Sequence, residues 1–578
     1  MTAAAGLAER RGSPWAVHVL GLLALAGWLV GMHLAHHALV DPDEARSALA
    51  ARLMAERGDW LVPHLPAVFH HDYRHDPLEG DVMVYWDKPP LYFWLSAAAM
   101  RVLGPTALAA RLPAGLAHIA MVLLVYAAGR KLRGGRAGLL AGIIAATAPL
   151  PLVLAHVARM DSLLVALMAA MLLAILHLVG GTARPWAWTA VLYSAAGLGL
   201  LAKGPEAVVL TAGAVLVTAL LTGRWRDLGR LRPVAGAVIC LAVAAPWYIA
   251  MHLRYPPAAD GTGGGFLYEF LVRQHVARVT SGEFGHAGHV PGYLLGILLV
   301  GFVPWTIFLP AACARLGRAG WRGRRERPAI VLLVVWAALV LVAFSCSKTQ
   351  LGHYILPAFP PLALVTGAYL ADRLGAEGGD RWLRVGLILT VVAGALALGA
   401  LVVGLVLAGL WRAPYIAITA LAVGLLVAGA LAVARRRHGA AVALLVAGTV
   451  AMETFTFTAD PFRIYGQYTT YGEFRVLVKS LRADDAVIAY PYTPYSFAWY
   501  LWPREVSYPT AEGSYEPNRD ALVAELNRPQ RTLCLLQKKA ILDVLRQKVR
   551  WPVQVLVQNP RHTLILTGPP DAEKSHGP

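Results

Sequence analysis

Acidic and basic side chains gather between Asp41 and Trp94, in a polar interval of an otherwise apolar chain. This interval begins Asp41-Pro42-Asp43-Glu44-Ala45-Arg46 and holds ten carboxylates, four histidines and five Lys or Arg. A carboxylate at a dry surface can act as a general base, as the counter-charge to an oxocarbenium ion or as a metal ligand, and a nearby Arg binds phosphate. A helix over 44–57 with Asp41 or Asp43 as its N-cap is the alternative explanation of the cluster. Taken alone, the pattern favours the cap.

A second group of candidates ends the same interval, where Asp87-Lys88-Pro89-Pro90 leads into an aromatic segment. Lys88 can pair with a lipid phosphate, and the two prolines fix the direction of the chain. A lysine that only anchors the chain beside an aromatic belt is the alternative. Tyr85 and Asp87 are counted with Lys88 as substrate-binding candidates.

Further ionisable residues stand at the ends of apolar segments. Taken singly, each is most often an interfacial anchor or part of a capped turn, but together they can surround one outer surface. They are Arg159, Asp161, Lys203, Lys348, His353 and Tyr354, with Arg273 in a 253–290 loop that is either a mobile lid over a site or a plain flexible loop.

Metal binding has weak support. His71 and His75 are spaced i, i+4, which places two ligands on one face of a helix, but Pro77 and the neighbouring charges favour a solvated loop. No cofactor is certain, and a divalent metal is left open.

The composition is that of a polytopic membrane protein, with 57% hydrophobic and 15% charged residues. The net charge of +18 comes mostly from Arg clusters between apolar segments, which the positive-inside rule explains without a nucleic-acid partner. A spanning helix needs roughly 20 apolar residues. Thirteen segments are expected to span: 15–35, 106–128, 137–156, 161–180, 186–202, 205–222, 233–252, 291–313, 329–345, 353–371, 383–409, 414–434 and 440–458.

The segment 89–100 is too short to cross a bilayer and is expected to lie in the interface. The basic loops at 130–136, 224–232, 315–327 and 435–437 then fall on the inside together with the N-terminus. The outer face would carry the loops 36–105 and 253–290, and everything after about 459.

The composition from about 459 onward is that of a soluble domain. Strands are predicted at 486–490, 532–536, 553–557 and 563–567, and helices at 520–526 and 539–549. The expected organisation is therefore a membrane domain over 1–458 and a small α/β domain over 459–578.

Several motifs together resemble those of the membrane glycosyltransferases of GT-C fold. They are the acidic pair after the first span, the Lys-Pro-Pro-Leu segment, Asp161, Leu-x-Lys-Gly-Pro at 201–205 and Ser-x6-Tyr-x-Leu-Pro-x-x-Pro at 347–360. The chain looks most like the bacterial lipid A aminoarabinose transferases, which are relatives of the protein O-mannosyltransferases. This resemblance implies an all-α membrane fold of about thirteen helices with a C-terminal α/β domain, in the inner membrane, with the N-terminus cytoplasmic and the C-terminal domain periplasmic.

The resemblance also implies a reaction, the inverting transfer of a sugar from a polyprenyl phosphate carrier to lipid A or another envelope acceptor. The sugar that it implies is 4-amino-4-deoxy-L-arabinose. By motif match, Asp43 is the essential carboxylate with Glu44 beside it, Arg46 and Lys88 hold the donor phosphate, and Asp161 supports the site. The sequence departs from the family where Asp87 replaces an expected Glu, and where 70–81 forms an insertion.

Two other functions compete with this interpretation. A lipid-linked sugar transporter or flippase would favour mid-helix charges, paired broken helices and repeat symmetry, whereas here the charges cluster at outer helix ends. A protein O-mannosyltransferase is the nearest enzymatic rival. It needs a base for its hydroxyl acceptor, whereas a phosphate acceptor is already an anion.

Overall fold

The structure is a computed structural model of the chain. It describes residues 15–32, 34–35, 38–69, 77–257, 264–281, 291–374, 381–407, 413–458, 481–482, 484–490, 495–501, 504, 506–507, 509, 517–537, 540–558 and 562–569.

The chain divides into two compact units. The first, called here the helical unit, consists of Met1–Leu34, Asp87–Tyr92 and Leu112–Ala459. The second, called the mixed unit, consists of Ala35–Trp86, Phe93–Arg111 and Asp460–Pro578. The mixed unit thus combines the long first loop with the C-terminal segment, a grouping that the sequence analysis did not predict.

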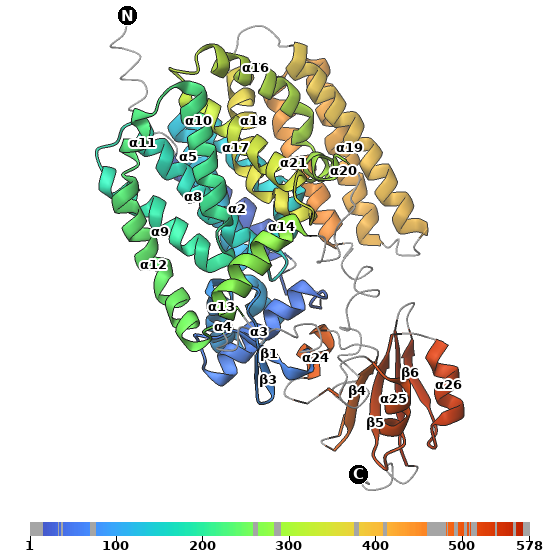
Figure 1. Ribbon diagram of the computed structural model, residues 1–578. Coiled ribbons are helices and arrows are strands. Elements are labelled where there is room, and N and C mark those ends of the chain that lie inside the picture. Colours follow the sequence, from blue (N-terminus) through green and yellow to red (C-terminus); the bar gives the residue numbers. More distant parts are fainter. Residues whose placement is uncertain are drawn as a thin grey trace, which may run out of the picture. The chain divides into compact units, whose positions relative to one another are not determined.

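Helices build the described part of the helical unit (Figure 1). Helix α5 belongs to this unit from Leu112 onward. The helices are α2 (Trp15–Gly31), α5 (Ala107–Arg133), α6 (Gly135–Thr147), α7 (Pro149–Ala155), α8 (Asp161–Val179), α9 (Pro185–Lys203), α10 (Glu206–Thr222), α11 (Arg226–Arg230), α12 (Pro233–Arg254), α13 (Gly265–Leu267), η2 (Tyr268–Ala277), α14 (Arg278–Thr280), α15 (Tyr293–Gly301), η3 (Trp305–Phe308), α16 (Leu309–Arg322), α17 (Pro328–Ser345), η4 (Gly352–Ala358), α18 (Phe359–Leu374), α19 (Arg381–Leu407), α20 (Ala413–Ala434) and α21 (His438–Thr458).

Helices α8 and α18 form the centre of this unit, because both are buried over most of their length. Helix α8 packs beside α9, and α18 packs beside α6. The α6–α18 contact is close: a Cβ atom on Gly367 would lie 2.6 Å from the Ala141 nitrogen. Small residues allow backbones to approach in this way, and van der Waals packing then holds apolar helices together.

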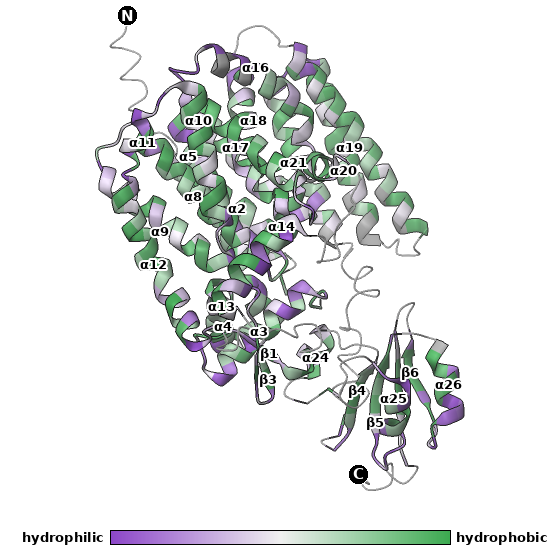
Figure 2. Ribbon diagram, viewed as in Figure 1, coloured by the Kyte–Doolittle hydropathy of each residue, from purple (hydrophilic) through white to green (hydrophobic). Residues whose placement is uncertain are grey.

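Seven helical spans among the described residues are long and apolar enough to cross a membrane, or nine if two bent helix pairs each count as one. They are Ala107–Arg133, Asp161–Val179, Pro233–Arg254, Pro328–Ser345, Gly352–Leu374, Arg381–Gly404 and His438–Thr456, with the pairs α6–α7 and α15–α16. Figure 2 shows hydrophobic residues along most of these helices. The chain is thus a polytopic membrane protein. The finer count of thirteen spans is not confirmed by this test.

The first loop contains two α-helices, a short 3-10 helix and a small sheet, and the sheet was not predicted from the sequence. Its elements are α3 (Asp43–Arg57), β1 (His64–Pro66), η1 (Ala67–Phe69), β2 (Leu78–Glu79), β3 (Val82–Val84) and α4 (Leu91–Leu103). The strands are antiparallel in the order β1-β3-β2, with His64 opposite Val84 and Leu78 opposite Met83. The helix expected over 44–57 is confirmed.

A buried ion pair fixes α3 to the start of α5. The Glu44 carboxylate accepts hydrogen bonds from Arg111 at 2.7 and 3.0 Å, and both side chains are almost completely buried. Glu44 also accepts from the Val40 N–H at 2.7 Å, and Arg111 donates to the Ala38 carbonyl at 3.0 Å. Buried charges persist only when they are paired and hydrogen-bonded in this manner.

The C-terminal part of the mixed unit is a four-stranded sheet with helices on both faces (Figure 1). Its elements are β4 (Ala486–Tyr490), α24 (Tyr495–Leu501), α25 (Arg519–Leu526), β5 (Thr532–Leu536), α26 (Ala540–Lys548), β6 (Gln554–Gln558) and β7 (Thr563–Thr567). The order is β4-β5-β7-β6, with β4 parallel to β5 and the other pairs antiparallel. The four predicted strands are confirmed to within one residue.

Alternation along β5 explains the two cores of this sheet. Leu533 and Leu535 face the side covered by α24, whereas Cys534 and Leu536 face α25 and α26. Apolar residues on both faces require cover on both sides, since successive strand side chains point in opposite directions.

We expect Glu44→Gln to lower the melting temperature of the detergent-solubilised protein strongly. The change leaves the Arg111 charge buried without its counter-charge, which costs about 3–5 kcal/mol. Glu56→Gln is the control, because Glu56 pairs with Arg52 at 2.8 Å but is 39% exposed, and loss of such a pair costs only about 0–1 kcal/mol. Replacing both Glu44 and Arg111 by Met should recover much of the loss. Equal melting temperatures for Glu44→Gln and Glu56→Gln would contradict this account.

Candidate functional site

Asp43 begins α3 without acting as its N-cap. The cap position is Pro42, which offers no side-chain hydrogen bond, so the N-cap interpretation of Asp43 is wrong. The Asp43 carboxylate instead pairs with Arg46 one turn further on, and its carbonyl accepts from the Ser47 hydroxyl at 2.8 Å. The Asp43 side chain is 35% exposed, so a ligand can reach it.

Arg46 contacts two tyrosine rings. Its guanidinium carbon is 5.7 Å from the centroid of Tyr85 and 5.7 Å from that of Tyr495. Cation–π contacts at this distance restrict the positions that the guanidinium can take. Arg46 with Asp43 and Tyr85 forms the group named here the first-loop cluster, which belongs to the mixed unit.

Glu44 and Asp43, although adjacent in sequence, have different environments. Both Glu44 oxygens are engaged by Arg111 and the carboxylate is buried. This ion pair occupies both oxygens of Glu44. Of the acidic pair predicted as catalytic, the geometry therefore leaves Asp43 as the accessible member.

Asp41 makes a contact that the sequence could not reveal. Its carboxylate accepts hydrogen bonds from the Ser496 backbone N–H at 2.8 Å and from the Ser496 hydroxyl. Burial raises the pKa of Asp41 to about 7, although the hydrogen bonds from Ser496 act in the opposite direction. Asp41 thus binds the start of α24 rather than capping its own helix.

A second charged group, named here the Asp161 cluster, lies in the helical unit. Asp161 is the first residue of α8 and is buried. Lys203, the last residue of α9, donates to one of its oxygens at 2.8 Å, and Arg159 donates to the other at 3.1 Å.

The Asp161 cluster continues through the residues around its cations. Lys203 also pairs with Glu206 at 2.9 Å and lies 5.2 Å from the centroid of Tyr354. His353 lies 2.9 Å from Arg159 and 4.0 Å from Asp161. The structure therefore brings together five of the candidate residues from the sequence: Arg159, Asp161, Lys203, His353 and Tyr354.

Residues 265–280 are helical rather than a plain flexible loop. They form α13, the π-helix η2 and α14, and η2 contacts the turn after α9. His275 lies 3.3 Å from the Lys203 carbonyl and 2.7 Å from the Phe270 carbonyl. The other parts of the predicted lid, residues 258–263 and 282–290, lie outside the described residues.

Asp87 is held by η2. Gln274 donates to the Asp87 carboxylate and accepts from Arg278 at 2.8 Å.

Burial lowers the pKa of His275, and the nearby charges of Lys88 and Arg278 lower it further, although hydrogen bonds to the Phe270 and Lys203 carbonyls oppose the change. Lys88 and Arg278 thus create a cationic environment around His275.

Two other predicted residues lie in simpler surroundings. Arg273 pairs with Glu269 one turn away at 3.2 Å. Lys348 is exposed in the turn before η4, where its backbone N–H donates to the Val279 carbonyl at 3.1 Å.

The part of the chain that the structure describes contains no group of three or more His, Cys, Asp or Glu side chains that could hold a metal ion. His71 and His75, the candidate ligands from the sequence, lie outside the described residues.

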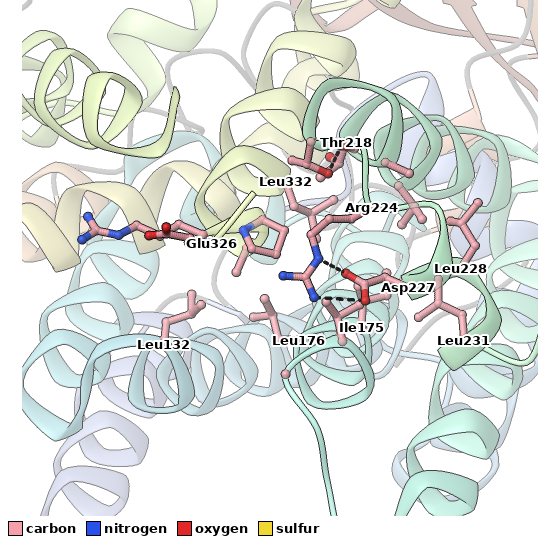
Figure 3. A pocket seen from close by; sticks show the side chains of 18 of the residues that line it. Leu132, Ile175, Leu176, Thr218, Arg224, Asp227, Leu228, Leu231, Glu326 and Leu332 are labelled. Atoms are coloured by element: carbon pink, nitrogen blue, oxygen red, sulfur yellow. Dashed lines mark hydrogen bonds and ion pairs between the residues drawn. The ribbon is translucent and has the colours of Figure 1, made fainter. Parts of the chain in front are cut away.

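A cavity of about 410 Å³ lies far from the Asp161 cluster, at the other end of α8. It is lined by Ile175, Leu176 and Val179 from that end, and by Arg224 and Asp227, which form an ion pair at 2.6 Å (Figure 3). Residues 161 and 179 are separated by about 27 Å along a helix that rises about 1.5 Å per residue. The cavity therefore takes no part in the chemistry of the Asp161 cluster.

The two clusters have the character of anion-binding groups, one at the start of α3 and one where α8 begins and α9 ends. Each holds Arg or Lys beside a carboxylate and aromatic rings. Such groups bind phosphate through charge-assisted hydrogen bonds, which are strong where water is scarce.

Comparison with known proteins agrees with this chemistry. The dolichyl-phosphate-mannose-protein mannosyltransferase family model matches residues 87–249. An undecaprenyl phosphate-alpha-4-amino-4-deoxy-L-arabinose arabinosyl transferase of Pectobacterium carotovorum is 32% identical over 381 residues, covering 65% of this chain and 63% of that protein. The enzyme of the same name from Pseudomonas aeruginosa is 31% identical over 384 residues, covering 64% of each chain. The chain thus spans less than two thirds of the length of these curated relatives.

The fold matches that of a solved membrane enzyme along almost the whole chain. The crystal structure of ArnT from Cupriavidus metallidurans bound to undecaprenyl phosphate superposes with a TM-score of 0.74 and 21% identity, covering 98% of this chain and 100% of that one. The GT-C fold and the resemblance to the aminoarabinose transferases are therefore confirmed. A fold by itself does not define an activity.

We expect Gly204→Ala to lower the melting temperature more than Gly181→Ala. Both glycines have positive φ, +104° and +81°, but only Gly204 has a close neighbour, since an added Cβ would lie 2.5 Å from His275 Nε2. Gly181→Ala therefore measures backbone strain alone, of about 1–2 kcal/mol. Gly204, at φ +104° and ψ −154°, adds a backbone conformation that is essentially restricted to glycine, and a clash with His275 that would displace η2. His275→Ala in the same chain should relieve the clash alone. If His275→Ala gave no relief of the Gly204→Ala loss, η2 would not dock at this turn.

Proposed function

We propose that this protein is an inverting glycosyltransferase that moves 4-amino-4-deoxy-L-arabinose from undecaprenyl phosphate to lipid A. The observation that carries the proposal is the similarity over 381 residues to an enzyme named for that carrier and sugar. The fold shared with ArnT bound to undecaprenyl phosphate supports it. The anion-binding character of both clusters is what a phosphate-linked donor requires.

In the proposed reaction, an oxygen of a lipid A phosphate attacks the anomeric carbon of the sugar. The bond between that carbon and the carrier phosphate breaks, and its electron pair stays on the phosphate oxygen. The configuration inverts because the attack comes from the face opposite the departing phosphate. The acceptor is already an anion and needs no general base. The chemical demand is therefore for cations on the departing phosphate and for a carboxylate beside the positive charge that develops on the sugar.

The residues of this chain meet that demand as follows. Arg46 and Lys88 hold the donor phosphate, and Asp43 steadies the developing charge on the sugar or orients the attacking group. Glu44 and Asp161 are positioning residues in this scheme, because each is buried and already paired with cations. Tyr85 positions Arg46 through its ring.

Other predicted residues receive supporting parts. Lys203, His353 and Tyr354 act with Asp161 as one unit, and Asp87 positions η2 through Gln274. Arg273 and Lys348 remain candidates for contacts with donor or acceptor.

The topology belongs to the same proposal. Each of the thirteen predicted spans coincides with a helix or a bent helix pair, and those below the length or composition limit are α2, α9, α10 and α20. We infer thirteen spans in a bacterial inner membrane, with the N-terminus cytoplasmic and a periplasmic α/β domain over 459–578. Arg clusters in the loops that this orientation places inside support it.

We expect cells that express the wild-type protein to gain aminoarabinose on lipid A, and cells that express Asp43→Asn to lose this modification. The amide keeps the size of the side chain but removes the charge that faces the sugar. Asp81→Asn is the matched control, since Asp81 lies in the same loop in an exposed pair with Arg57 at 3.0 Å. Mass spectrometry of lipid A measures the outcome, with the protein level checked in each strain.

Each result has a defined meaning. Full modification in the Asp43→Asn strain would remove Asp43 from its central role. Unmodified lipid A in the wild-type strain would contradict the acceptor assignment, and glycoproteins and other envelope glycans would then be examined. The mannosyltransferase family match at residues 87–249 makes a protein acceptor the second candidate.

A further inference from the structure

Helix α24 connects the two parts of the mixed unit. Phe497 and Leu501 pack into one core of the C-terminal sheet, together with Val487, Leu533 and Leu564. Other side chains of the same short helix contact the first loop. The helix is therefore held from both sides.

Contacts from several residues of the first loop fix α24. Arg52 donates to the Trp499 carbonyl at 2.9 Å, with its guanidinium carbon 5.2 Å from the centroid of the Trp499 ring. The Leu39 N–H donates to the Tyr500 hydroxyl at 3.2 Å, and Asp41 accepts from Ser496. Polar contacts at three residues of α24 define one register of this helix on the loop.

Tyr495 is placed by this docking. Its ring stacks on Phe69, with centroids 4.2 Å apart and an interplanar angle of 21°. Its exposed fraction is 6%, and the Arg46 guanidinium carbon lies 5.7 Å from its centroid. The first loop supplies Tyr85 against the same guanidinium, whereas the C-terminal segment supplies Tyr495.

We propose that Tyr495 is a positioning residue for donor binding, through which the C-terminal domain holds Arg46 in the orientation that binds the carrier phosphate. The inference rests on the transferase activity proposed above. Arg has many rotamers, and fixing its plane before the donor arrives reduces the entropy lost on binding. A guanidinium restrained by two rings and by Asp43 has a fixed position from which its remaining N–H groups can bind phosphate oxygens.

The test compares the full-length Tyr495→Leu and Tyr495→Phe variants in detergent or vesicles. Undecaprenyl phosphate-linked 4-amino-4-deoxy-L-arabinose is the varied donor. Loss of the ring should raise the KM for the donor roughly 3- to 30-fold, the range expected for one cation–π contact, with a smaller change in kcat. Tyr495→Phe keeps the ring and should restore the wild-type KM.

The control removes an aromatic ring from the same domain without touching the first loop. Trp551 packs in the opposite core of the sheet, where its indole N–H donates to the Arg528 carbonyl at 3.1 Å. Trp551→Leu should lower the melting temperature but leave the donor KM unchanged. A KM rise of the same size in Trp551→Leu and Tyr495→Leu would show that only domain stability matters and would overturn the proposal.

A second measurement does not depend on activity. In a double-mutant cycle on melting temperature, Arg46→Met and Tyr495→Leu should be non-additive, because each removes the same contact. Additive shifts would overturn the proposed role of Tyr495 even if the wild type transfers sugar normally. Inactivity of the wild type with this donor, together with non-additive shifts, would instead overturn the transferase proposal and leave the Tyr495–Arg46 contact established.

Discussion

The polar end of the helical unit depends on one buried carboxylate, Asp161. Lys203 and Arg159 reach its two oxygens, and His353 lies next to both Asp161 and Arg159. Three elements meet there, since Asp161 begins α8, Lys203 ends α9 and His353 lies in η4. Charge buried at the end of apolar helices is costly unless it is compensated. The pairing therefore fixes how these helix ends approach one another, and the π-helix η2 then rests on the turn that Lys203 begins.

The mixed unit contains one charged pair that is buried and another that is partly exposed. Glu44 and Asp43 are neighbours in sequence, yet Glu44 is buried in an ion pair with Arg111. Asp43 is partly exposed and pairs with Arg46, which also contacts two aromatic rings. The rigid pair holds α3 in place, and the other pair can then present a carboxylate and a guanidinium from a fixed helix. Preorganised groups of this kind are what a phosphate-linked sugar donor needs, because the protein does not have to reorganise as the leaving phosphate gains charge.

Local sequence pattern predicted the regular elements well and the contacts between distant segments poorly. Strands β4, β5 and β7 and the α3 helix follow from apolar periodicity and charge at their ends, and the Asp161 and Lys203 motifs lie in one cluster as the outer-face grouping suggested. No local signal links Asp41 to Ser496 or Arg46 to Tyr495, because those contacts join segments about 450 residues apart. The N-cap interpretation of Asp43 failed for a local reason: the helix includes Asp43 as its first residue, and the Asp43 carboxylate pairs with Arg46 one turn further on.

The proposed transferase activity depends on recognition of a carrier phosphate by cations of this chain, and a direct binding measurement tests that recognition before any chemistry. Purified protein should bind undecaprenyl phosphate in detergent micelles and bind the neutral alcohol undecaprenol far more weakly. The Arg46→Gln, Lys88→Gln double variant should lose this preference at a temperature where it is still folded. Equal affinity of the wild type for the phosphate and the alcohol, or an unchanged preference in the double variant, would contradict the account.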